Sequence, residues 1–201
     1  IQMRAANGRA EANYRRAENN FQRAVEVVNR MLTRVGAKDL ADVPEMEPVR
    51  RALLADATAF LNGLLADRDQ ASRPSVRREL ALARRRLAEL QESLGEYGRA
   101  EAEYRQALAA EEALAAQLPA RAEYRSGLAE TRRVLGLMLG RLYRHSEAES
   151  LLLTARAVWE PQARTDPVAQ RWFAIITCEL AALGEHGQAG RYSDEAIRLM
   201  E

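Results

Sequence analysis

Cysteine, aromatic residues and long apolar runs are all scarce in this chain of 201 residues. Its single cysteine, Cys178, excludes an internal disulfide and agrees with a reducing compartment. No apolar run approaches the roughly 18 residues of a membrane-spanning helix, and no charged-then-apolar leader opens the chain. We therefore expect a soluble, cytoplasmic fragment. Because Ile1 already lies in a helical pattern, we also expect it to belong to a longer protein.

An excess of either charge is missing too, since 30 basic residues face 29 acidic ones. The chain therefore has no overall field that would draw it onto nucleic acid or an anionic membrane. Its basic run at 77–86 is interrupted by Glu79 and lacks the interleaved aromatic residues of a site for nucleic-acid bases. We predict no nucleic-acid partner and no membrane insertion.

The composition favours long amphipathic helices, because 47% of the residues are apolar, 29% are charged and only 6 are prolines. The hydrophobic periodicity predicts an all-α protein of eight helices without strands. These helices are expected at about 5–35, 49–66, 75–95, 97–117, 121–142, 146–159, 167–183 and 186–200. We predict an N-terminal helical region at 1–70, with an irregular proline-containing loop at 38–48, followed by a repeat array at 71–201.

Three local signals mark helix ends. Gly95 stands where a left-handed cap is expected. Ser146 with Glu149 matches the capping box, and Asp166 before Pro167 matches an N-cap followed by a first-turn proline.

An internal repeat carries the fold prediction. Each copy has an alanine, a residue four positions on and a second alanine seven positions on. A large-small pair ends twelve residues before the first alanine in three copies, and a fourth, partial copy that begins at Ala17 matches the second-helix half only. These positions share one helical stripe, where small side chains allow a partner helix to approach closely. The repeat positions are Ala17, Phe21, Ala24, Leu87, Ala88, Ala100, Tyr104, Ala107, Leu135, Gly136, Ala148, Ala155, Ala189 and Ala196.

These residues resemble the helix-turn-helix signature of tetratricopeptide (TPR) repeats. The resemblance implies a right-handed α-solenoid of antiparallel helix pairs, with about three pairs in 71–201. The spacing is lengthened, since 48 residues separate Ala100 from Ala148, against about 34 in the standard repeat. Arg84 and Arg132 also replace the usual first-helix aromatic residue, which only Phe173 keeps.

The runs 20–28 and 40–54 are similar to the TPR regions of large bacterial signalling proteins, commonly serine/threonine kinases. No kinase signature occurs in the chain. The resemblance therefore implies a non-catalytic scaffold that binds a peptide or a partner protein in its concave groove.

By the same resemblance, the first helix of each pair lines that groove. The implied groove residues are Arg85, Arg86, Glu89, Arg133, Leu137 and Arg141. The family's lysine-asparagine clamp for C-terminal carboxylates is absent, because Glu89 and Leu137 stand at the asparagine positions. The arginines favour an acidic ligand, although a merely solvated basic face has the same pattern.

No catalytic, cofactor or metal site is predicted. His145 and His186 occupy equivalent turn positions, and no cysteine or histidine cluster accompanies them. Carboxylates such as Glu147 and Glu149 lie among arginines on solvated helix faces, which favours ion pairing over acid-base chemistry. Two alternatives to peptide binding remain: self-association as a dimerisation or spacer module, and regulation by a small molecule held in the groove.

Overall fold

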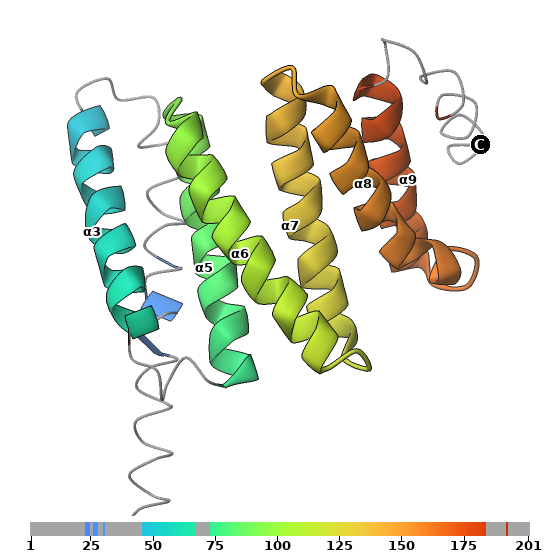
Figure 1. Cartoon of the computed structure of the whole chain (residues 1–201), viewed down its shortest axis with the longest axis horizontal. Coiled ribbons are helices and arrows are strands. Elements are labelled where there is room, and N and C mark those ends of the chain that lie inside the picture. Colours follow the sequence, from blue (N-terminus) through green and yellow to red (C-terminus); the bar gives the residue numbers. More distant parts are fainter. Residues whose placement is uncertain are drawn as a thin grey trace, which may run out of the picture. The chain divides into compact units, whose positions relative to one another are not determined.

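The computed structural model describes residues 46–66 and 73–183, together with positions 23, 24, 26, 27, 30 and 192. This part of the chain is all-helical and contains no strand (Figure 1). Its elements are α3 (Glu47–Ala66), α5 (Pro74–Ser93), α6 (Tyr97–Gln117), α7 (Ala122–Arg141), α8 (His145–Trp159), the short 3-10 helix η2 (Glu160–Gln162) and α9 (Pro167–Leu183). The all-α prediction is confirmed for these residues.

Several predictions lie outside the described residues. These are most of the first helix and its loop, the last helix at 186–200, His186 and the repeat positions Ala17, Phe21, Ala189 and Ala196. Ala24 is described, and it is helical and half-buried.

The helix ends test the predicted caps. The backbone N–H of Val168 donates to Asp166 Oδ1 at 2.9 Å, so the N-cap of α9 is confirmed. The capping box at Ser146 is wrong, because α8 begins at His145 and its N-cap, Arg144, makes no side-chain cap bond. The N–H of Arg144 is instead bound to the carbonyl of Leu139 at 2.9 Å, and this turn starts the helix two residues earlier than the motif requires.

Two compact units make up the chain, 1–110 and 111–201, with the division inside α6. Each is described by itself, and the predicted boundary at residue 70 stays a prediction. In the first unit, Leu54 and Ala57 of α3 pack against a buried stripe on α5. That stripe consists of Val76, Leu80, Ala83, Leu87 and Leu90.

A buried ion pair joins α5 to α6 in this first unit. Arg84 and Glu103 are only 3% and 6% exposed, and Arg84 Nη1 donates to Glu103 Oε2. Arg84 Nη2 also donates to Asn62 Oδ1 of α3 at 2.8 Å. Arg84 stands where the TPR pattern has an aromatic residue, and these partners allow a charge to be buried there.

In the second unit, α7 and α8 form a helical hairpin joined by residues 142–144, and α9 packs against α8 (Figure 1). A Cβ at Gly136 would lie 3.1 Å from Leu152 Cγ and 3.2 Å from the carbonyl oxygen of Ala148. Only a very small residue fits this helix crossing. The repeat alanines are fully buried in the same way: Ala88, Ala100, Ala107, Ala148 and Ala155 each have 0% exposure.

One turn occurs twice, 48 residues apart. After α5, the N–H groups of Gly95 and Glu96 bind the carbonyls of Glu92 and Gln91, each at 2.9 Å. After α7, those of Tyr143 and Arg144 bind the carbonyls of Gly140 and Leu139, at 3.0 and 2.9 Å. Both are Schellman motifs, whose C′ residue is left-handed. The sequence repeat is therefore also a repeat of backbone structure.

Candidate functional site

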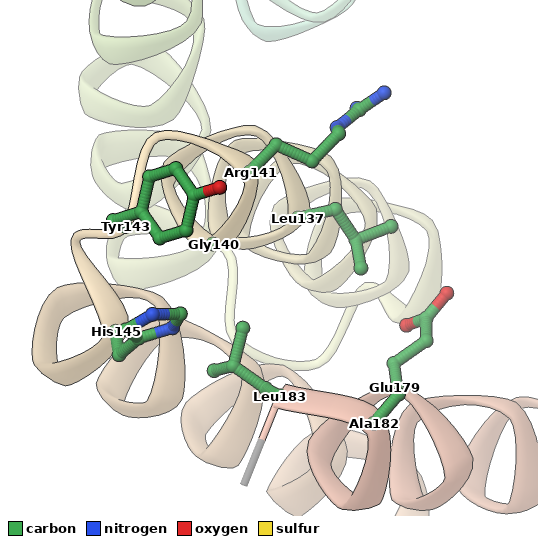
Figure 2. A pocket seen from close by; sticks show the side chains of 8 residues that line it. All are labelled: Leu137, Gly140, Arg141, Tyr143, His145, Glu179, Ala182 and Leu183. Atoms are coloured by element: carbon green, nitrogen blue, oxygen red, sulfur yellow. The ribbon is translucent and has the colours of Figure 1, made fainter. Parts of the chain in front are cut away.

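A cavity of about 470 Å³ lies between α7 and α9 in the second unit. Figure 2 shows its lining side chains, with Leu137 of α7 and Leu183 of α9 on opposite sides of the space. The full lining is Leu137, Gly140, Arg141, Tyr143, His145, Glu179, Ala182 and Leu183. Most of this surface is apolar, as is typical of ligand pockets, with a few polar groups at its edges.

Gly140 leaves room for a side chain of α9 against α7. A Cβ added at this position would collide with Cδ1 of Leu183. Glycine therefore allows the Leu183 side chain to lie directly against the α7 backbone, where it forms part of the cavity wall.

Tyr143 and His145 form one end of the cavity, at the turn between α7 and α8. Tyr143 has a φ of 61°, the left-handed region that favours glycine, and its counterpart in the first turn is Gly95 with a φ of 75°. An L-residue in this conformation costs roughly 1–2 kcal/mol. The Tyr143 side chain is nevertheless 84% exposed, and its ring meets that of His145 edge-on at 6.0 Å. The turn thus presents an aromatic ring to solvent beside the cavity.

Glu179 of α9 supplies a carboxylate to the cavity lining and belongs to a charged cluster with Arg133 and Glu130 of α7. Arg133 Nη1 donates to Glu179 Oε1 at 2.5 Å, and Arg133 Nη2 donates to Glu130 Oε1 at 3.1 Å. The guanidinium also lies over the ring of Trp172, 5.5 Å from its centre, and Trp159 stacks on Trp172. Arg133 is thereby held on three sides.

The pKa shifts in this cluster show which charge lacks compensation. Burial opposes the charge on Arg133, but the hydrogen bonds and charges of Glu130 and Glu179 outweigh it and raise the pKa of Arg133. Burial raises the pKa of Glu179, and Arg133 offsets this only in part while the charge of Glu130 adds to it. Both pKa values are raised, which favours the charged form of Arg133 and the neutral form of Glu179, because one cation is shared by two carboxylates. Glu179 carries the negative charge that Arg133 does not fully compensate. Its buried Oε2 accepts no hydrogen bond from the described residues.

The predicted groove residues fall into two groups. Leu137 and Arg141 line the cavity, and Arg133 lies behind it in the charged cluster. Arg85, Arg86 and Glu89 are on α5 in the first unit. Arg141 extends away from Leu183 and His145 in Figure 2.

The sequence interpretation missed Tyr143, Glu179 and Leu183. For Tyr143 a signal was available, because the repeat aligns it with Gly95, and a bulky residue at a glycine position indicates a local requirement. Glu179 and Leu183 gave no such signal, since they lie in an ordinary amphipathic helix.

A second cavity, of about 440 Å³, lies in the first unit, with lining residues from α3, α5 and α6. Its charged lining is largely paired internally: Glu96 contacts Arg51 at 3.7 Å and Arg99 at 3.1 Å, and Glu103 binds Arg84. The cavity between α7 and α9 is the stronger candidate, because two predicted groove residues, Leu137 and Arg141, line it.

Comparison of the chain with protein-family models, curated proteins and solved structures finds no match in any of the three. The TPR resemblance rests on the repeat residues alone and stays a prediction. In the described ranges, no group of three His, Cys, Asp or Glu side chains is placed to hold a metal ion. None of the helices placed by the structure combines the length and hydrophobicity needed to cross a membrane.

Proposed function

We propose that this chain is a non-catalytic binding module that holds a peptide or a segment of a partner protein in the cavity between α7 and α9. One observation carries the proposal: Leu137 and Arg141, two residues that the repeat pattern assigns to a ligand groove, both line this cavity. The cavity is bounded by α7 and α9, which are the first helices of successive repeats in that pattern.

The finer architecture belongs to the same proposal. The helices form a right-handed TPR-type array with lengthened repeats, in which α5 pairs with α6 and α7 with α8. The repeated Schellman turn and the close approach at Gly136 support this assignment. By resemblance, the array is the interaction region of a larger bacterial signalling protein of the kinase-associated type.

Binding by such a site needs little reordering of the receptor. Gly140 and Leu183 are already in contact, and Tyr143 is held by the hydrogen bonds of its turn. A ligand that enters preformed walls loses less free energy to ordering than one that must organise a loop. The site therefore suits an extended or helical peptide.

The experiment selects, from a random peptide library, the peptides that bind to the immobilised chain. Leu137→Gln places an amide in the apolar wall and should abolish capture of the enriched peptides. Val168→Gln is the matched control. Val168 belongs to the same unit, but it is 59% exposed and does not line the cavity. Enriched peptides that bind Leu137→Gln as well as the unmodified chain would contradict the proposal.

A small-molecule site is the second candidate function, because about 470 Å³ lies within the range of roughly 300–1,000 Å³ typical of ligand pockets. Thermal-shift screening against metabolites distinguishes it, since a ligand that binds only the folded state raises the Tm. Self-association as a dimerisation or spacer module remains an alternative, and light scattering on the isolated chain tests it.

A further inference from the structure

The cavity lining holds one cation, Arg141, and one carboxylate, Glu179, and not the set of arginines that the repeat pattern suggests. Arg133 already binds Glu130 and Glu179, so its guanidinium is occupied by the protein itself. The same cluster contributes a carboxylate, Glu179, to the cavity lining, with Oε2 buried and without a donor. Arg141 does not supply that donor, because its side chain points away from Glu179 in Figure 2.

We infer that the cavity binds a basic side chain of the partner, a lysine or an arginine, whose cationic head pairs with the partly exposed carboxylate of Glu179. The inference rests on the proposed function and names the chemistry of its ligand. The long aliphatic stem of such a side chain matches the apolar walls, since Leu137 and Leu183 flank the space next to Glu179 (Figure 2).

Tyr143 gives the same ligand a second contact. Its ring is exposed at the opposite end of the cavity and is fixed by a turn that holds the backbone in a left-handed conformation. It can therefore pack against the residue next to the basic one. Aromatic rings attract apolar side chains and cations alike, and both occur in a peptide that alternates basic and apolar residues.

The ionisation of Glu179 supports this choice of charge. Burial raises the pKa of Glu179 because Arg133, shared with Glu130, compensates its negative charge incompletely. A ligand cation supplies the missing compensation, and an acidic ligand adds to the repulsion. A charge-assisted hydrogen bond to a carboxylate is roughly twice as strong as a neutral one, so the head group should dominate selectivity.

The test uses the whole chain and three capped peptides that differ at one position. The probes are acetyl-Ala-Leu-Lys-Leu-Ala-amide and its twins with norleucine or glutamate in place of the lysine. Each is titrated by calorimetry into the unmodified chain, Glu179→Gln and Glu112→Gln. Glu112 is the matched control, because it is a carboxylate of the same unit that pairs with Arg132 and does not line the cavity.

The lysine peptide should bind the unmodified chain at least tenfold more tightly than the norleucine peptide, about the effect of one charge-assisted hydrogen bond. Glu179→Gln should remove this preference, and Glu112→Gln should keep it. Equal binding of lysine and norleucine peptides, or preference for glutamate, overturns the basic ligand and leaves peptide binding in place. Failure of all three peptides to bind, together with failure of the library selection, overturns the proposed function itself.

Discussion

Gly95 and Tyr143 occupy the same position in two copies of one helix-ending turn, with φ angles of 75° and 61°. The backbone hydrogen bonds around them correspond one for one. The first turn uses the residue that this conformation favours, whereas the second uses a tyrosine whose ring lies beside the candidate cavity. The second turn is therefore less stable than the same turn with glycine, but it presents an exposed aromatic side chain.

Tyr143→Gly should raise the free energy of unfolding by about 0.5–1 kcal/mol. Relief of the left-handed strain, about 1–2 kcal/mol, is partly offset by the greater backbone entropy of glycine in the unfolded chain. Gly95→Ala is the counterpart: a Cβ there meets no atom within 4 Å, so no clash adds to the strain, and the lower backbone entropy of alanine in the unfolded chain offsets part of it. A loss of about 1 kcal/mol is expected. Urea denaturation measures both, and a stabilising Gly95→Ala would contradict the assigned turn.

Gly136→Val should destabilise the chain by about 1–3 kcal/mol, because even a Cβ would lie 3.1 Å from Leu152 and the valine methyl groups would overpack the crossing of α7 and α8. Gly98→Ala serves as the control in a helix position with no neighbour within 4 Å, and there alanine should stabilise by up to about 1 kcal/mol. Thermal unfolding followed by circular dichroism compares the two. Equal effects would mean that the α7–α8 approach is looser than described.

Glu103→Ala should cost about 3–5 kcal/mol, because it leaves the buried guanidinium of Arg84 without its carboxylate. Glu101→Ala, on the same helix, breaks the more exposed pair with Arg105 and should cost less than about 1 kcal/mol. The double change Arg84→Met with Glu103→Leu should recover most of the loss, since a matched apolar pair needs no charge compensation. Denaturant titration measures the free energy of unfolding of these variants and of the unmodified chain.

Glu179 should make stability fall as the pH rises. Its pKa is raised in the folded state above the ordinary value of 4.5, so the folded chain binds more protons than the unfolded one between 4.5 and the raised value. Its stabilising contribution is complete below pH 4.5 and is lost as the pH rises through the folded pKa. The slope from this one group is at most about 1.4 kcal/mol per pH unit.

Glu179→Gln should remove that component of the pH profile, and Glu112→Gln should retain it. Urea denaturation at a series of pH values from acid to neutral measures the difference. A profile unchanged by Glu179→Gln would show that Glu179 is fully compensated in the folded chain.

Local patterns in the sequence predicted the helices of the described residues well, because each pattern depends on neighbours a few residues apart. The periodicity gave the helical content, and Asp166 with Pro167 gave the start of α9. The one local motif that was wrong, at Ser146, was overridden by a hydrogen bond from Arg144 back to the preceding helix.

The sequence by itself determined that the described part of the chain is all-helical, with a turn repeated at 48 residues, since hydrophobic periodicity and small-residue spacing act within one or two helices. Only the tertiary structure decided which charges remain for a ligand. The sequence suggests that the guanidinium of Arg133 faces a ligand in the groove. In the structure it forms an ion pair with Glu179, 46 residues away. Charges act through space, so their balance follows from which helices pack together and not from the order of residues along the chain.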